Sequence, residues 1–281
     1  MDWSKAKSIL IVALIVTNSL LGYVLFVDQN NVDATVQTEF IEETVNLLNN
    51  KNIKLETEIP TINPKLFGLT VEYEILDIAT LNDNFFQGKG IVEVKGEGLL
   101  EISYGNQLLT VINKKFIIYE SKSEEIKFDS ISEQQAIEIA KNYIKNNGFI
   151  ITDMELSFIK VVDGVYNIEF TKVFDGNFME ATFTNIQLDS RGVRKLERVW
   201  LNMNDMGANP IHISSAPKSI LALLSMEEVY GKTISKISLC YYFDPEKHDY
   251  IENPGEAQQG RAIPAWRVQF TDGYKVFIDN Y

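Results

Sequence analysis

YNIEFT, residues Tyr166–Thr171, lines up with WRVQFT, residues Trp266–Thr271, at a constant offset of 100 residues. Both hexapeptides alternate apolar and polar side chains, which is typical of a half-buried β-strand. Each is followed by a second strand that ends in Leu188-Asp189 or Ile278-Asp279. This agreement predicts two tandem units of similar fold, although alternating strands also match one another by chance.

A helix is predicted ahead of the strands in each unit. Ser132-Glu133-Gln134-Gln135 has the form of a capping box, and the helix that it begins should end at Asn147-Gly148. Ser214 or Ser215, with Pro217 just behind, is the expected start of the second helix. The two units are predicted to cover residues 131–205 and 206–281, each a short helix followed by an antiparallel sheet.

Nearer the N-terminus, residues 28–130 are predicted to form one helix and an antiparallel meander. Apolar residues recur at helical spacing between residues 33 and 50, and residues 67–75 alternate strictly, as in a strand. Later strand-like runs are joined by turn sequences such as Gly105-Asn106. The expected class is therefore α+β, with helices packed on antiparallel sheets.

The uncharged stretch ILIVALIVTNSLLGYVLFV, Ile9 to Val27, is the other organising feature. At about 1.5 Å per residue it would make a helix of roughly 28 Å, close to the thickness of a bilayer core. Lys5 and Lys7 precede it and acidic residues follow, so the positive-inside rule places residues 1–8 in the cytoplasm. We expect a single transmembrane helix over residues 9–27, embedded in the lipid bilayer of the cell membrane, with an extracytoplasmic body. A cleaved signal peptide is the main alternative, but bulky residues occupy the expected cleavage region.

One face of this helix is expected to contact a partner helix. Spacings of three and four residues place Ile11, Ile15, Asn18, Gly22 and Leu25 on that face. Asn18 can hydrogen-bond to a neighbouring helix, and Gly22 allows two backbones to approach closely. The alternative is that a lone helix simply tolerates one Asn and one Gly.

Charge and residue composition argue against nucleic-acid binding, disulfide bonding and metal binding. The formal net charge of −13 disfavours binding to nucleic acid. The single cysteine, Cys240, excludes an intramolecular disulfide. His212 has no other potential metal ligand close to it in the sequence. His248 lies in a charged segment with Asp244 and Glu246, which we interpret as a solvent-exposed loop rather than a metal site.

Catalytic motifs are absent from the sequence. It contains no glycine-rich phosphate loop and no serine nucleophile elbow, and its carboxylates form no recognisable acid–base pair. We therefore predict a non-enzymatic protein with no catalytic residues, no cofactor and no metal.

The opening Met1-Asp2-Trp3-Ser4-Lys5-Ala6-Lys7, followed by the apolar run with Asn18 and Gly22-Tyr23, resembles the start of the YycI (WalI) family. The resemblance continues in ISEQQAIEIAKNYI, residues 131–144, and in PAWRV, residues 264–268, with Phe277-Ile278-Asp279 near the end. The last two segments also resemble PepSY-like units, in which a short helix precedes an antiparallel sheet.

The resemblance implies a bitopic accessory protein of Gram-positive bacteria. Such a protein would act with a YycH-like sister protein to bind and modulate the sensor histidine kinase WalK (YycG), whose two-component system controls cell-wall metabolism. Two alternatives stay open. One is an extracytoplasmic module that binds a wall-derived ligand, peptide or ion in a groove between the units, and the other is an inhibitor of a surface protease.

Overall fold

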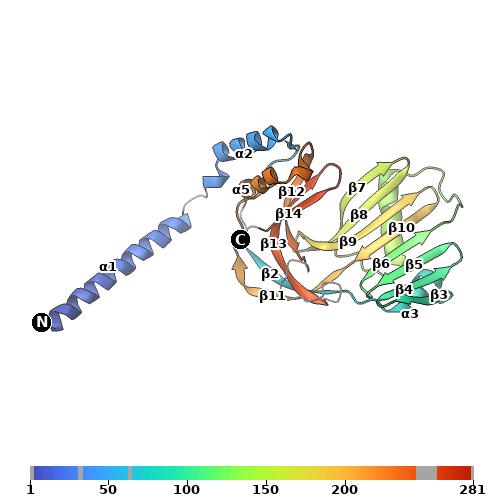
Figure 1. Cartoon of the computed structure of the whole chain (residues 1–281), viewed down its shortest axis with the longest axis horizontal. Helices are drawn as coiled ribbons and strands as arrows, with labels where there is room; N and C mark the ends of the chain where they lie inside the picture. The colour runs from blue at the N-terminus through green and yellow to red at the C-terminus, as the bar shows by residue number, and fades with distance from the viewer. Residues whose placement is uncertain (1–2, 31–33, 63–64, 245–257, 280–281) are drawn as a thin grey trace.

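Helix α1 (Trp3–Asn30) projects from a body made mostly of β-strands in the computed structural model, which describes residues 3–30, 34–62, 65–244 and 258–279 (Figure 1). Strands account for 45% of the residues and helices for 27%. The body therefore relies on sheet packing, with its helices laid on sheet faces.

The predicted transmembrane helix is corrected by this structure. Among the described residues, no helix is long and apolar enough to cross a membrane. Thr17, Asn18 and Ser19 place three polar side chains in the middle of the apolar run of α1. This finding contradicts the expected single-pass anchor over residues 9–27, from which the cytoplasmic tail and the extracytoplasmic body were deduced.

Unit 1 consists of α4 (Glu133–Asn146), β7 (Met154–Val162), β8 (Val165–Phe174) and β9 (Asn177–Asp189). The capping box is confirmed: the Ser132 hydroxyl accepts a hydrogen bond from the Gln135 backbone N–H, and the Gln135 side chain accepts one from the Ser132 N–H. Tight turns at Asp163-Gly164 and Asp175-Gly176, all with positive φ, join the three strands into an antiparallel meander.

The same sheet continues beyond unit 1. Strand β10 (Gly192–Val199) pairs with β9 on one side and with β6 (Phe116–Ser121) on the other. Beyond β6 the strand order is β5 (Gln107–Ile112), β4 (Leu99–Tyr104) and β3 (Ile91–Gly96), and β3 forms the edge of the sheet.

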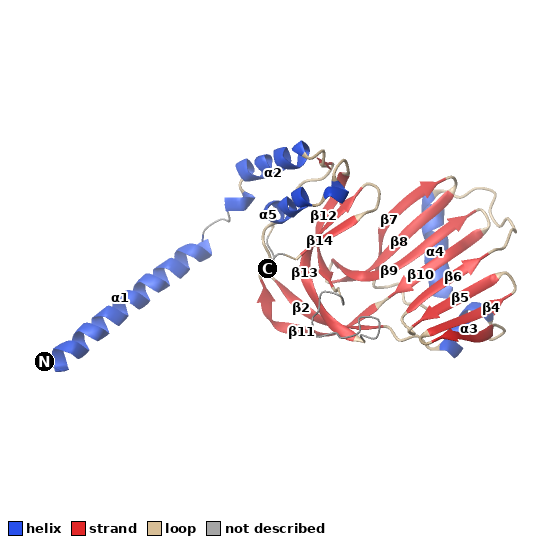
Figure 2. Cartoon of the chain, viewed as in Figure 1, coloured by secondary structure: helices blue, strands red, loops and turns tan. Residues whose placement is uncertain are grey.

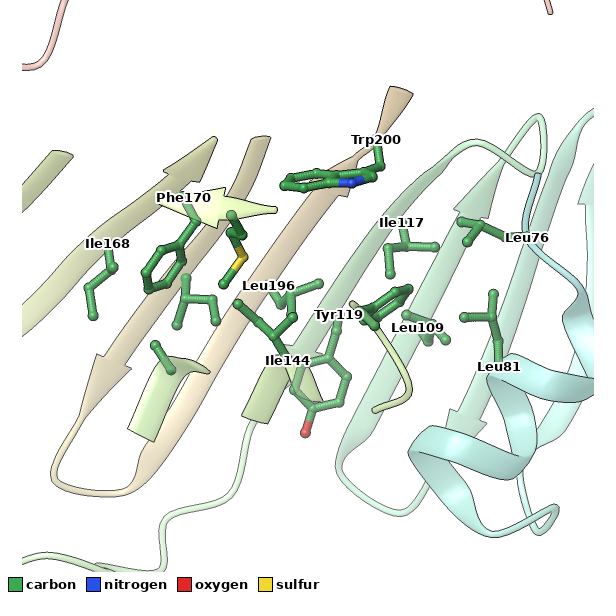
Figure 3. Close-up of a cluster of buried hydrophobic side chains, with 14 of the residues drawn as sticks. Leu76, Leu81, Leu109, Ile117, Tyr119, Ile144, Ile168, Phe170, Leu196 and Trp200 are labelled. Atoms are coloured by element: carbon green, nitrogen blue, oxygen red, sulfur yellow. The ribbon is translucent and has the colours of Figure 1, made fainter. Parts of the chain in front are cut away.

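Helices α4 and α3 (Ile78–Phe86) cover the same face of this sheet (Figure 2). Their apolar side chains meet those of the strands in one core, in which Leu81 and Ile144 face Leu109, Ile117 and Leu196 (Figure 3). Helix α3 was not predicted, although Asp77 caps it by accepting a hydrogen bond from the Thr80 N–H. No helix among the described residues covers the opposite face, which we call the open face.

Unit 2 consists of α5 (Ala216–Ile220), β12 (Thr233–Tyr242), β13 (Gln259–Phe270) and β14 (Lys275–Ile278). Two 3-10 turns, Leu221–Ser225 and Glu227–Val229, follow α5. Helix α2 (Thr38–Asn50) packs beside α5 on the same core, after a short 3-10 turn at Ala34–Val36 (Figure 2).

Three further strands complete the sheet around unit 2. Strand β2 (Leu66–Tyr73), close to the predicted range 67–75, pairs with β13, and β11 (Leu201–Ile211) pairs with β2. The short β1 (Lys54–Leu55) pairs with β12 in parallel.

The two units share their strand register. Tyr166 lies opposite Leu188 on β8 and β9, and Trp266 lies opposite Ile278 on β13 and β14. The first strand of each unit has a register irregularity at the same place, between Leu156 and Phe158 in β7 and between Ile234 and Lys236 in β12. The residues skipped at these two places are both serines, Ser157 and Ser235.

A matching hydrogen bond ties each helix to its sheet. The Tyr166 hydroxyl donates to the backbone oxygen of Ile131, and Trp266 Nε1 donates to that of Ser214 at 2.8 Å. Ile131 and Ser214 each stand directly before the N-cap of the unit's helix. The correspondence between Tyr166 and Trp266 therefore extends to strand pairing and to helix attachment, although the other corresponding residues are 90 and 83 positions apart. The predicted domain boundaries remain a prediction.

The units join edge to edge through a parallel pairing. Cys240, Tyr241 and Tyr242 of β12 lie opposite residues 178–180 of β9, and this pairing connects the strands into a 14-stranded network over the described residues. The expectation of purely antiparallel sheets is therefore corrected. Alternation in a sequence predicts which face of a strand is buried but carries no information on which distant strand becomes its neighbour.

Candidate functional site

The partner-helix face predicted in α1 is exposed. Ile11 and Ile15 are 55% and 60% exposed, and Asn18 and Gly22 lie on the surface beside them. The Leu25 side chain lies outside the described residues. Eight large apolar side chains of α1 between Leu10 and Leu21 are each more than half exposed, so the body leaves this helix uncovered (Figure 1).

The histidines bring no metal-binding group together. His212 is exposed, and His248 lies outside the described residues. Over the part of the chain that the structure describes, no group of three or more His, Cys, Asp or Glu side chains is placed to hold a metal ion.

A buried polar cluster lies where the two units meet. Arg267 of β13 is fully buried, and its Nε donates to Oε1 of Glu180 on β9 at 2.5 Å. Its other nitrogens donate to Gln269 Oε1 at 2.6 Å and to the hydroxyl of Ser157, the serine at the irregularity in β7, at 2.7 Å. The guanidinium also lies over the ring of Phe178, 4.7 Å from its centroid. Every nitrogen of this guanidinium therefore has a partner, as a buried charge requires.

A second ion pair extends the cluster toward the surface. Lys275 of β14 contacts Oε1 of Glu169 on β8, and its Nζ lies 3.9 Å from Oε2 of Glu180. Ser157 connects the two pairs because its hydroxyl also donates to Glu169 at 3.0 Å. Burial raises the pKa of Glu180, while Lys275 and Arg267 act in the opposite direction. With two cations and two carboxylates, the cluster is neutral overall.

Above this cluster the surface is hollowed. The hollow has a volume of about 460 Å³ and lies between the open face of unit 1 and the β14 side of unit 2. A smaller hollow of about 200 Å³ adjoins it on the open face and shares Glu169 and Asn185 with it. We call the two together the inter-unit cleft. Its polar and aromatic lining includes Asn167, Glu169, Phe183, Asn185, Gln187, Lys195, Glu197, Tyr242, Asp244, Tyr274, Lys275 and Phe277.

Apart from Asp244, which was weighed with Glu246 and His248 as a metal ligand, no residue of this cleft was considered as a site residue from the sequence. Asn167, Glu169 and Gln187 occupy ordinary outward-facing positions of alternating strands, so nothing local marks them. One signal was present in the aligned hexapeptides, where Asn167 corresponds to Arg267 and Glu169 to Gln269. A polar position that changes character between two repeats indicates that the repeats use that face differently.

Comparisons with known proteins give a fold neighbour and no family. No family model matches the chain, and no curated protein matches it. An uncharacterised protein from Eubacterium rectale has a similar solved structure, with a TM-score of 0.51 and 12% sequence identity over 84% of this chain and 94% of that one. The Bacillus megaterium YpeB C-terminal domain is another structural neighbour, with a TM-score of 0.40 and 12% identity over 71% of this chain and 87% of that one.

The first neighbour shows that this fold occurs in a protein from Eubacterium rectale. The second is a looser likeness on which no argument rests. Neither neighbour tests the resemblance to the YycI family, which stays a prediction.

Proposed function

We propose that this protein is a non-enzymatic regulator that binds a sensor histidine kinase of the WalK (YycG) type together with a YycH-like sister protein. The observation that carries the proposal is the uncovered surface of α1. Contiguous exposed apolar surface of this kind is typical of interaction sites. The resemblance of the N-terminal residues to the YycI family supplies the identity of the partners.

The contact is assigned to the face of α1 that carries Ile11, Ile15, Asn18 and Gly22. Gly22 has no atom within 4 Å of the position that a Cβ would occupy, so another helix can approach its backbone closely. Asn18 offers a donor and an acceptor for a partner helix. The opposite side of α1 lacks both features: there the hydroxyl of Thr17 already donates to the Ala13 backbone oxygen at 2.9 Å.

Co-purification of the kinase with the full chain tests this assignment. We expect Asn18→Leu/Gly22→Leu to abolish recovery of the kinase, because the double substitution fills the close-approach site and removes the amide. The matched control is Ala13→Leu/Thr17→Leu, which adds similar apolar bulk on another side of the same helix. Equal recovery with both variants would exclude the proposed face, and no recovery with the wild-type chain would exclude the kinase as the partner.

A further inference from the structure

The charged groups of the inter-unit cleft are already paired within the chain. Lys275 contacts Glu169, and Lys195 lies 2.6 Å from Glu197. The Tyr242 hydroxyl donates to Asp244 at 2.9 Å. An ionic ligand would have to displace one of these internal partners, whereas an uncharged ligand would leave them in place.

The remaining polar groups are side-chain amides, of which Asn167 already donates through Nδ2 to the backbone oxygens of Lys160 and Val165 at 3.5 and 3.4 Å. Asn167 and Gln187 lie directly opposite each other on β8 and β9, and Asn185 follows one step along the same face. Asn185 Oδ1 is buried and has no hydrogen-bond partner among the described residues. A buried acceptor without a partner is uncommon in folded proteins, and here it lies where the two hollows meet. Amides both donate and accept, which matches the hydroxyl groups of a polyol.

Aromatic rings stand at the other end of the cleft. Tyr242 and Phe277 stack with ring centroids 4.6 Å apart, and Phe183 and Tyr274 complete the lining. Such rings present apolar faces beside polar groups, which suits a ligand with both C–H and O–H surfaces. A volume of about 460 Å³ lies within the usual range for ligand sites.

Strand topology argues against a peptide paired to β8 or β9, the two strands that carry the amide groups. An extended peptide is normally recognised by adding a strand to a free sheet edge, through main-chain hydrogen bonds. Strands β8 and β9 are both paired on two sides, so their backbones are not free to bind one. Recognition over β8 and β9 must come from side chains, which favours a ligand rich in its own polar groups, although β7 and β14 at the sides of the cleft are each paired with one strand only.

We propose that the inter-unit cleft binds a short, uncharged oligosaccharide. Asn185 accepts a hydrogen bond from a ligand hydroxyl or N–H group at the centre, Asn167 and Gln187 contact a second sugar ring, and Tyr242, Tyr274 and Phe277 pack against the first. The proposal does not depend on the partner contacts of α1.

Calorimetric titration of the full chain with chitotriose and with cellotriose tests this site. We expect at least one of the two sugars to bind, and Asn185→Leu to weaken that binding by about tenfold or more, because one buried hydrogen bond is lost. Tyr274→Ala, on the rim of the cleft, should also weaken binding while leaving Asn185 in place. The matched control is Asn204→Leu, an exposed amide on β11, which should bind like the wild type.

Three outcomes would overturn the proposal. They are the absence of binding by both sugars, equal binding by the wild type and both cleft variants, and tighter binding of an uncharged tripeptide such as trialanine amide than of either sugar. Circular dichroism of each variant separates a loss of binding from a loss of fold.

Discussion

The two units have the same three-stranded register but use their outer faces in opposite ways. In unit 1, Asn167 and Glu169 of β8 face the inter-unit cleft. In unit 2, the corresponding Arg267 and Gln269 of β13 are buried against Phe178, Glu180 and Ser157 of unit 1. One copy of the repeat therefore exposes a polar sheet face, while the other uses the same positions to attach the copies to each other.

We call the contact between the units, formed by the β9–β12 pairing and the buried Arg267–Glu180 cluster, the joint. The difference between the units shows that the joint and the cleft arise from the same packing. Replacing an amide with Arg267 places a charge on the face of unit 2, and that charge is tolerated because unit 1 supplies Glu180 as its partner. The attachment brings β14 over the open face of unit 1, so Lys275 and Phe277 line the cleft. The cleft is a consequence of how the repeats pack, and each repeat contributes one side of it.

The largest expected effect is on the free energy of unfolding, and it should differ between Arg267 and the equivalent Asn167. Arg267→Ala should lower the free energy of unfolding by about 3–5 kcal/mol, because Glu180 would lose its buried partner. Asn167→Ala, at the same place in unit 1, should change it by no more than about 0.5 kcal/mol. Urea denaturation of the two variants and the wild type measures both values. Equal losses would mean that the two faces are not used differently.

A smaller loss of stability is expected at the hydrogen bond that attaches the helix to the sheet, a feature that both units share. Tyr166→Phe removes the hydrogen bond to Ile131 that attaches α4 to β8, and it should cost about 1 kcal/mol of unfolding free energy. The control is Tyr104→Phe, since Tyr104 is 44% exposed at the end of β4. If Tyr166→Phe and Tyr104→Phe have the same stability, the bond contributes nothing to the attachment of the helix.

The smallest effect concerns the pH dependence of the joint. Burial raises the pKa of Glu180 above its ordinary value of 4.5. A carboxyl group with a raised pKa in the folded state stabilises the fold below its ordinary pKa, and this contribution is lost as the pH rises through the folded-state value. We therefore expect the stability of the wild type, relative to Glu180→Gln, to fall as the pH increases from 4.5.

Denaturation of the wild type and Glu180→Gln between pH 4.5 and 8 measures that trend. Glu124→Gln, whose side chain is 78% exposed, controls for general surface charge. A relative stability that rises with pH would contradict a raised pKa for the Glu180 carboxyl group.

Local signals predicted the local structure well. The Ser132 capping box marks the start of α4, and the strict alternation of residues 67–75 marks β2, because both patterns depend on neighbours along the chain. Helix α3 was missed, although Asp77 and the spacing of Ile78, Leu81 and Phe85 carried a helical signal in nine residues, Ile78–Phe86. A helix this short depends mainly on tertiary packing for its stability.

The joint and the cleft could not be predicted in the same way. The parallel pairing of Cys240 with Phe178 connects strands that are far apart in sequence, and no local pattern records it. Asn185 and Tyr274 come together only after that pairing forms. The apolar run of α1 misled the interpretation for the opposite reason, since its composition suggested a membrane span that the described helix does not provide.

Cys240 lies inside the joint, on β12 opposite Phe178 of β9, and is fully buried. Burial raises the pKa of its thiol, so a reagent that requires a thiolate lacks both access and a charged nucleophile while the joint is closed. Cys240 is also the only cysteine of the chain. Its rate of chemical labelling therefore reports how often the two units separate, without any engineered probe.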